Sequence, residues 1–209
     1  MTTTRAPLTR ERIIAQAVAT ADRDGVEEVS MRKLGAALGV EAMSLYNHVA
    51  NKDDIYDGMI DHVFRSIPLP PSDTDWRESL RETALVTLDE FLAHPWIVGL
   101  LMQRGIYGPY SLQFADRALG VLRGAGLSDE DAHHAWQMLA SHTMGYAIQE
   151  VSGATDQLAW EDWARSIPNL SAFPHVEALA PYLARCEFRS EFAFGLEIIL
   201  DGLEARIPD

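Results

Sequence analysis

The sequence predicts an all-α protein made of a small N-terminal helical bundle and a larger helical unit. Apolar residues recur at intervals of three and four in successive segments between residues 9 and 206, which is the period of a helix packed on one face. Glycine and proline fall between these segments, where helices end. No segment alternates apolar and polar residues as a half-buried strand does. A chain of 209 residues with 47% hydrophobic residues can bury a sizeable core.

The first helix is predicted over residues 9–22, with Ile13 and Ala17 on its apolar face. Ser30 then has the character of an N-cap for a second helix. Gly39 stands where that helix must stop, because glycine enters the left-handed conformation of a helix C-terminus without strain.

Residues 30–52 are the most informative stretch, because they predict two short helices joined by a tight glycine turn. Helices joined in this way form the helix-turn-helix motif, whose second helix enters the major groove of DNA. Leu45 and Val49 are expected to pack inward from the second helix. The residues left to face outward are Ala42, Met43, Ser44, Tyr46, Asn47 and His48. A helical hairpin in an all-α enzyme shows the same periodicity, so that alternative stays open at this point.

A longer helix is predicted to follow and to end near Ile67. Asn51 and Asp54 have the spacing of a capping box, and an apolar stripe at four-residue spacing starts at Ile55. Lys52 lies beside the capped N-terminus, where backbone N–H groups and the helix dipole favour an anion. This end of the helix is therefore a candidate phosphate site.

Segment 68–75 marks the predicted boundary between two domains, residues 1–67 and 68–209. Its prolines and polar residues break the preceding helix. Further helices are predicted over 76–94, 95–103, 110–124, 129–151 and 188–206, with one short helix near 175–185. Ser128 starts a further capping box before the 129–151 helix.

The net charge of −14 is unevenly divided along the chain. Residues 1–67 contain eight Lys and Arg against ten Asp and Glu, whereas residues 68–209 contain nine against twenty-one. A nearly neutral DNA-binding domain makes few phosphate contacts per subunit, so affinity is expected to depend on pairing two such domains. The acidic second domain argues against an architectural protein that coats DNA.

Composition and motifs also limit the compartment and the chemistry. The single cysteine, Cys186, excludes an intramolecular disulfide framework, and the N-terminus lacks an apolar signal segment. No stretch reaches the roughly 20 apolar residues of a membrane span, so we expect a cytoplasmic protein without membrane contact. The sequence holds no phosphate-cradling glycine loop and no zinc-ligand spacing. We expect no cofactor, no metal and no enzymatic activity.

Four stretches of the N-terminal part follow one another in a recognisable order: Arg12-Ile-Ile-Ala-Gln-Ala, Asp24-Gly-Val-Glu-Glu-Val-Ser-Met-Arg-Lys-Leu, Leu38-Gly-Val and Leu45-Tyr-Asn-His-Val-Ala-Asn-Lys-Asp. Through them the chain, from Arg12 to about Ile67, resembles the tetracycline-repressor (TetR) family of bacterial transcription regulators. It implies a recognition helix from about residue 42 to residue 48. The DNA-binding residues implied are Ser30, Arg32 and Lys33 at the preceding helix, Ala42, Met43, Ser44 and Asn47 at base edges, and Tyr46, His48 and Lys52 at phosphates. The operator sequence does not transfer, since some members carry other residues at positions 43 and 47.

The predicted C-terminal helix carries more apolar surface than one core face requires. A buried central helix and a dimer interface made with the 129–151 helix both fit this pattern, and the small Gly195 and Gly202 would permit close helix approach. This helix also resembles the C-terminal helix of tetracycline repressors, which dimerise through a four-helix bundle. The resemblance implies a two-fold homodimer. The interface residues expected are Phe192, Leu196, Ile199 and Leu203.

The second domain is rich in aromatic and methionine side chains, which line either a core or a ligand cavity. We predict one cavity lined by Trp96, Met102, Tyr110, Phe114, His142, Tyr146 and Glu150. His142 and Glu150 match in spacing the positions where the tetracycline repressor lines its drug and magnesium site. The position of that site's principal metal-binding histidine falls within the apolar segment 96–102, so the effector expected is another aromatic or polycyclic organic molecule. A satisfied core residue or a dimer contact stays an alternative for His142 and Glu150.

These observations predict a homodimeric, ligand-responsive regulator that binds double-stranded operator DNA. The expected form is a repressor released from a palindromic operator by a small organic effector. An activator or a ligand-independent regulator of the same fold is the alternative, and an all-α enzyme is a remote one. By the resemblance, the effector changes the separation of the two recognition helices, which must match successive major grooves about 34–36 Å apart.

Overall fold

The structure is a computed structural model, and it describes residues 7–106, 108–152, 166–183 and 187–208. Within these ranges the regular structure is helical and contains no strand. The predicted all-α fold is therefore confirmed.

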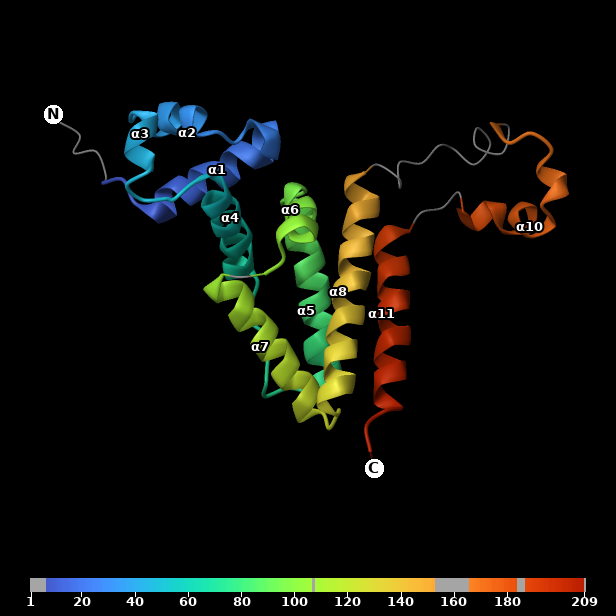
Figure 1. Cartoon of the computed structure of the whole chain (residues 1–209). Coiled ribbons are helices and arrows are strands. Elements are labelled where there is room, and N and C mark those ends of the chain that lie inside the picture. The colour runs from blue at the N-terminus through green and yellow to red at the C-terminus, as the bar shows by residue number, and fades with distance from the viewer. Residues whose placement is uncertain (1–6, 107, 153–165, 184–186, 209) are drawn as a thin grey trace.

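Four helices form the N-terminal bundle (Figure 1): α1 (Arg10–Asp24), α2 (Met31–Leu38), α3 (Ala42–Leu45) and α4 (Lys52–Ser66), with the 3-10 helix η1 (Val26–Glu28) after α1. Ile13, Leu34, Leu45 and Ile55 come one from each helix, and all four are fully buried. Each helix therefore buries its apolar stripe only when the other three are in place.

Side-chain caps fix where several helices begin. The side chains of Thr9, Ser30, Asn51 and Ser128 each accept a hydrogen bond from the backbone N–H three residues later. Gly39 ends α2 in the left-handed conformation, with φ of 65°. These caps confirm the helix starts and the turn predicted from the sequence, and each satisfies backbone groups that the helix itself leaves unpaired.

The second unit contains α5 (Trp76–Ala93), α6 (Trp96–Arg104), α7 (Pro109–Gly124), α8 (Asp129–Val151), η2 (Leu170–Ala172), α10 (Pro174–Leu183) and α11 (Phe188–Glu204). Helix α8 packs against α5, α7 and α11, and α10 stands apart from this layer (Figure 1). Helix α4 packs on α6 and α7, so one continuous hydrophobic core joins the two units. The domain boundary at residues 67 and 68 stays a prediction.

Helices α5 and α6 meet at a bend of 107° beside Pro95. None of the described helices is by itself long and apolar enough to cross a membrane. The bent pair of α5 and α6 passes that test of length and composition when the two helices are taken together.

The predicted interface residues of α11 lie in the core of their own chain. Phe192, Leu196 and Leu203 are at most 4% exposed, and Ile199 packs against the same cluster. The stripe is buried because α11 lies along α8 of the same chain, so these side chains are not available to a second subunit. These interface residues are therefore corrected to core residues of the contact between α8 and α11, although α11 itself is not a central helix, because its other face is exposed.

A different face of α11 carries apolar side chains that are exposed in the single chain. Phe194 is 70% exposed and Ile198 is 56% exposed, and Met138 on α8 is 49% exposed. Gly195 permits the close approach of α11 to α8, because an added Cβ would lie 2.5 Å from Cε1 of His142. Gly202 faces open space within the chain.

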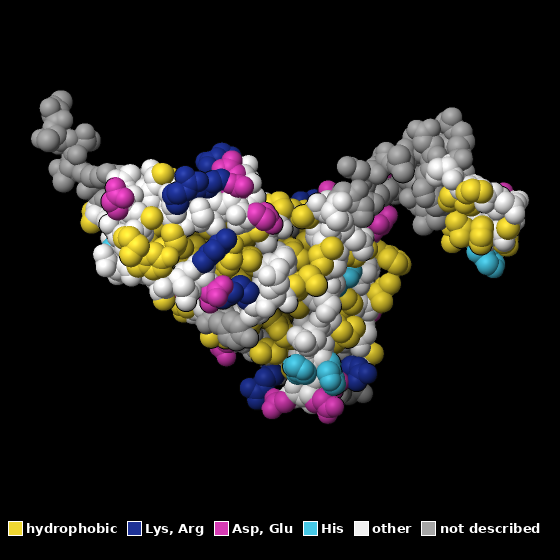
Figure 2. Space-filling view, turned by 45° about the horizontal axis from the view of Figure 1, so that its top comes forward, with side chains coloured by type: hydrophobic (Ala, Val, Ile, Leu, Met, Phe, Trp, Pro, Cys, Tyr) yellow, Lys and Arg dark blue, Asp and Glu magenta, His cyan; other side chains and the backbone are white. Residues whose placement is uncertain are grey.

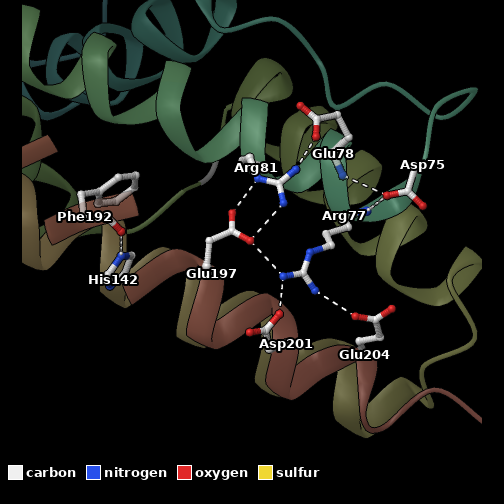
Figure 3. A network of polar contacts seen from close by, with 9 residues as sticks. All are labelled: Asp75, Arg77, Glu78, Arg81, His142, Phe192, Glu197, Asp201 and Glu204. Atoms are coloured by element: carbon white, nitrogen blue, oxygen red, sulfur yellow. Dashed lines mark hydrogen bonds and ion pairs between the residues drawn. The ribbon is translucent and has the colours of Figure 1, made fainter. Parts of the chain in front are cut away.

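A network of charged side chains fastens α11 to α5 (Figure 3). Arg81 donates to both carboxylate oxygens of Glu197, at 2.6 and 3.0 Å, and Arg77 donates to Glu197 at 2.9 Å. Arg77 also pairs with Asp201 and Glu204. Hydrogen bonds from Arg81 and then Arg77 hold the pKa of the Glu197 carboxyl at about 2, below its ordinary 4.5.

Candidate nucleic-acid interface and ligand cavity

The helix-turn-helix is formed by α2, the turn at Gly39 and the short helix α3, which continues as turns through residues 46–48. Leu45 and Val49 are 0% and 2% exposed, so they anchor this segment to the bundle as predicted. Gly35 sets the closeness of α2 and α3, because an added Cβ would lie 2.9 Å from the carbonyl oxygen of Val40. Sequence reasoning missed this role of Gly35, which depends on the spacing of two backbones.

The outward face of this segment is open to solvent. Met43 is 73% exposed and Tyr46 is 47% exposed, and Asn47 and His48 are also exposed. Ala42 and Ser44 are half-buried. An exposed apolar Met beside polar side chains suits base edges and thymine methyl groups. The assignment of these residues to DNA contact stays a prediction.

Three predicted residues lie around the start of α2. Arg32 is exposed and, among the described residues, makes no ion pair within the chain. Lys33 pairs with Glu28, and Ser30 uses its hydroxyl oxygen as the cap of α2. Arg32 is therefore the cation most available to a DNA phosphate or guanine, whereas Lys33 must first leave Glu28.

Lys52 lies at the first turn of α4 and is exposed. Its ammonium lies 5.1 Å from the centre of the Tyr56 ring, a cation–π contact that directs the side chain. Figure 2 shows Lys and Arg side chains gathered on the N-terminal bundle with acidic side chains among them. This mixture agrees with the nearly neutral charge of residues 1–67.

An apolar cavity of about 110 Å³ lies between α4 of the N-terminal bundle and α5, α7 and α8 of the second unit. Its described lining residues are Phe64, Leu80, Thr83, Ala84, Thr87, Phe91, Leu101, Ile106, Phe114, Ala118, Trp136, Leu139, Ala140, Thr143 and Met144. No charged side chain is among them. The only polar side-chain atoms are three threonine hydroxyls and the indole nitrogen of Trp136.

The seven residues predicted for the effector site are not gathered around this cavity. Phe114 lies on the cavity wall. Met102 is 67% exposed and Tyr110 is 39% exposed, with the Tyr110 ring 5.3 Å from the Arg65 guanidinium carbon. Trp96 is buried, and its indole nitrogen donates a hydrogen bond of 2.6 Å to Asp22 of α1. Trp96 therefore joins α6 to α1.

The polar face predicted along α8 separates into different environments. The Nε2 atom of His142 lies 2.9 Å from the Phe192 carbonyl oxygen, and the two rings stack with centroids 4.8 Å apart. Tyr146 packs edge-on against Phe192 and Phe188, and Glu150 is exposed. His142 is thus a satisfied residue of the α8 and α11 contact, the alternative that the sequence left open. The α8 residues that line the cavity at this level are instead Thr143 and Met144, which point in other directions around the helix than His142.

Helix α6 connects the cavity to the DNA-binding bundle. Leu101 lines the cavity, and Arg104, one turn later, bonds to Asp57 of α4 at 2.7 and 3.2 Å and to Asp53 at 2.9 Å. Asp61 of α4 accepts hydrogen bonds from the first backbone N–H groups of α7. No sequence pattern indicated these pairs, because their partners are about 50 residues apart.

An exposed helix-turn-helix surface on an all-α scaffold, with an apolar cavity in the adjoining helices, is the architecture of a DNA-binding protein with a ligand site. Comparison with known proteins gives the family. The model of the tetR family of bacterial regulatory proteins matches residues 13–59, and that of the tetracyclin repressor-like C-terminal domain matches residues 67–207. The chain belongs to the TetR family. It is a ligand-responsive transcriptional regulator and not an enzyme.

Individual relatives agree with this assignment along the whole chain. The HTH-type transcriptional repressor DrrR1 of Streptomyces coeruleorubidus is 33% identical over 96% of this chain and 78% of the relative. The tetracycline repressor protein class E of Escherichia coli is 29% identical over 98% of this chain and 94% of the relative. The solved structure of ActR from Streptomyces coelicolor in complex with actinorhodin superposes with a TM-score of 0.85, at 30% identity over 98% of this chain and all of that one.

Proposed function

We propose that this protein is a repressor that is released from a palindromic operator when an organic effector fills the apolar cavity. The observation that carries the proposal is the position of α4 between the two sites. Lys52 at one end of α4 follows the helix-turn-helix directly, and Phe64 near the other end lines the cavity. The repressor names of DrrR1 and of the tetracycline repressor support the sign of regulation.

The cavity is linked to the recognition segment through α4 by packed contacts and ion pairs. A ligand that displaces Phe64 or Leu101 moves α4 directly or moves the Arg104 and Asp57 pair that holds it. Because α4 is 15 residues long, a small tilt at Phe64 is carried about 20 Å to the other end. Ligand binding would then favour a spacing of the recognition segments that no longer fits DNA.

We further propose that two chains pair through the exposed apolar face of α8 and α11 formed by Met138, Phe194 and Ile198. Dimerisation is typical of this family, and pairing is needed if two nearly neutral DNA-binding bundles are to bind with high affinity. Phe194→Glu should give a folded monomer, since this side chain is 70% exposed in the single chain. Light scattering that finds an unchanged dimer for this variant would contradict the proposed interface.

The experiment that tests the proposed function is selection of duplexes from a random DNA pool, followed by gel shift at fixed salt. We expect an enriched palindromic sequence that the protein prefers over a scrambled duplex. Arg32→Ala should weaken binding to the selected duplex by about 1–3 kcal/mol, the range for a charge-assisted or bidentate contact. Equal affinity for all duplexes would exclude a site-specific regulator.

The alternative is an activator or a ligand-independent regulator of the same fold. A transcription assay with the selected duplex upstream of a reporter separates these outcomes. Lower transcription in the presence of the protein supports the repressor, and higher transcription supports the activator.

The DNA target of this regulator puts its proposed site of action in the cytoplasm.

A further inference from the structure

The cavity between α4, α5, α7 and α8 is apolar apart from a few hydrogen-bonding side chains. Three threonines line it: Thr83 and Thr87 on α5 and Thr143 on α8. Thr87 and Thr143 are 8% and 4% exposed, so their hydroxyl groups are shielded from bulk water. Their hydrogen bonds determine what a ligand can offer them.

Each of these hydroxyls already donates a hydrogen bond to a backbone carbonyl oxygen of its own helix. Thr83 donates to the Ser79 carbonyl oxygen at 2.7 Å, Thr87 to that of Thr83 at 2.7 Å, and Thr143 to that of Leu139 at 2.9 Å. A hydroxyl has one donor and two acceptor lone pairs. Toward a ligand these hydroxyl oxygens can therefore act only as hydrogen-bond acceptors, and the ligand group that complements them is a hydrogen-bond donor.

The other residues that line the cavity disfavour a charged ligand. No charged side chain is among the described residues that line the cavity, so a carboxylate placed there would lose its hydration without gaining a cationic partner. Four aromatic side chains, Phe64, Phe91, Phe114 and Trp136, are among the lining residues that a ring would contact.

The cavity size sets how much of a ligand it can take. A dry apolar cavity of about 150 Å³ holds a benzene molecule, and this one is about 110 Å³. This cavity is the smaller of the two, so a single aromatic ring fits only when a half-buried lining side chain, Trp136 or Met144, moves aside.

We infer that the cavity is a site for neutral hydroxyarenes, in which a phenolic hydroxyl donates to the threonine oxygens and the ring packs among the aromatic side chains. The inference rests on the proposed function in taking this cavity as the effector site. It adds the chemical class of the effector: an uncharged aromatic molecule with a hydroxyl donor, and not an aromatic acid.

The test uses p-cresol and p-xylene, which have nearly one shape, and p-toluate with its neutral isostere p-toluamide, which separate the effect of charge from that of size. Binding to the full-length protein is measured by calorimetry or ligand-observed NMR at millimolar probe concentration. The variants are Thr83→Val, Thr87→Val and Thr143→Val, made singly and together, because valine keeps the shape of threonine and removes its acceptor. Thr20→Val is the matched control, since Thr20 is 3% exposed and donates to the Gln16 carbonyl oxygen at 2.8 Å in α1, away from the cavity.

We expect p-cresol to bind, p-toluate not to bind, and p-toluamide to bind more tightly than p-toluate. The triple variant should weaken p-cresol by at least about fivefold, the loss of one hydrogen bond, and leave p-xylene as tight or tighter. Thr20→Val should change neither, and circular dichroism checks that each variant is folded. Absence of p-cresol binding, equal binding of p-toluate and p-toluamide, or a triple variant that treats p-cresol and p-xylene alike would overturn the inference.

Release of the selected duplex is measured separately in the same samples. If p-cresol binds with the expected threonine dependence but does not change DNA affinity at saturation, the chemistry of the cavity stands and the effector role fails. If p-toluate binds the protein and causes it to release DNA, the proposed function is supported and the hydroxyarene class of effector is wrong.

Discussion

Replacing Glu197 by Gln should loosen the attachment of α11 to α5. The carboxylate accepts two hydrogen bonds from Arg81 and one from Arg77, all between 2.6 and 3.0 Å (Figure 3). These bonds lower the pKa of Glu197 from 4.5 to about 2, which corresponds to roughly 3 kcal/mol at 1.36 kcal/mol per pH unit. Because the Glu197 side chain is 40% exposed, water screens the interaction, and we expect Glu197→Gln to lower the free energy of unfolding by about 1–2 kcal/mol.

The effect has a defined dependence on pH. A carboxyl whose pKa is lowered by folding stabilises the protein above its unfolded-state pKa, and this stabilisation disappears as pH falls through the folded-state pKa. The difference between the natural protein and Glu197→Gln should therefore be full at pH 7 and decline between about pH 4.5 and pH 2. The two charged partners Arg77 and Arg81 keep their protons throughout this window.

Thermal and urea unfolding measure the change. For a chain of this size, 1–2 kcal/mol lowers the melting temperature by about 3–6 °C. Glu82→Gln is the matched control, because Glu82 lies on α5 away from the helix ends and is exposed. Melting temperatures for Glu197→Gln and Glu82→Gln that agree within 1 °C at pH 7 would refute the reasoning, as would a difference that grows toward acid pH.

Three further predictions concern DNA contact, coupling and assembly. Tyr46→Ala should weaken binding to the selected duplex by about 1–3 kcal/mol if its hydroxyl bonds to a phosphate, and an unchanged gel-shift affinity would remove Tyr46 from the interface. Arg104→Gln breaks the ion pairs from α6 to Asp53 and Asp57 of α4. It should leave the affinity for the cavity ligand within about twofold and reduce the ligand's effect on DNA binding by several-fold. Full release of DNA by the ligand in this variant would show that the coupling does not depend on these pairs. Leu196→Glu should unfold the chain, because Leu196 is 1% exposed and the charge would be buried, whereas Ile198→Glu at 56% exposure should give a folded monomer. Circular dichroism and light scattering distinguish these two results. An equal loss of structure in both variants would argue against the assignment of the two faces.

The local features of the fold were predictable because they depend on neighbours in sequence. The caps at Ser30 and Asn51, the turn at Gly39 and the inward positions of Leu45 and Val49 all follow from side chains that act within one helical turn. The same is true of the exposed residues on the recognition segment. The family resemblance rested on this region for the same reason.

The faces of the long helices were harder to assign, because an apolar stripe does not say which partner covers it. The stripe of Leu196 was expected at a dimer interface, and α8 of the same chain covers it. His142 was expected in the cavity, and a rotation of one residue around α8 places Thr143 there instead. Helices α8 and α11 each carry apolar side chains on more than one face, so periodicity gave no single answer.

The sequence by itself determined the class of protein, most helices with their caps, and the exposed segment that we predict to contact DNA, since each of these is encoded in short-range patterns. Only the tertiary structure decided which side chains surround the cavity and which ion pairs join it to α4. Thr87 and Thr143 are 56 positions apart in the chain and face the same cavity only because α5 packs on α8. Arg104 reaches Asp57 across 47 residues for the same reason. Such pairs depend on how helices pack against one another, and no local pattern in the sequence carries that information.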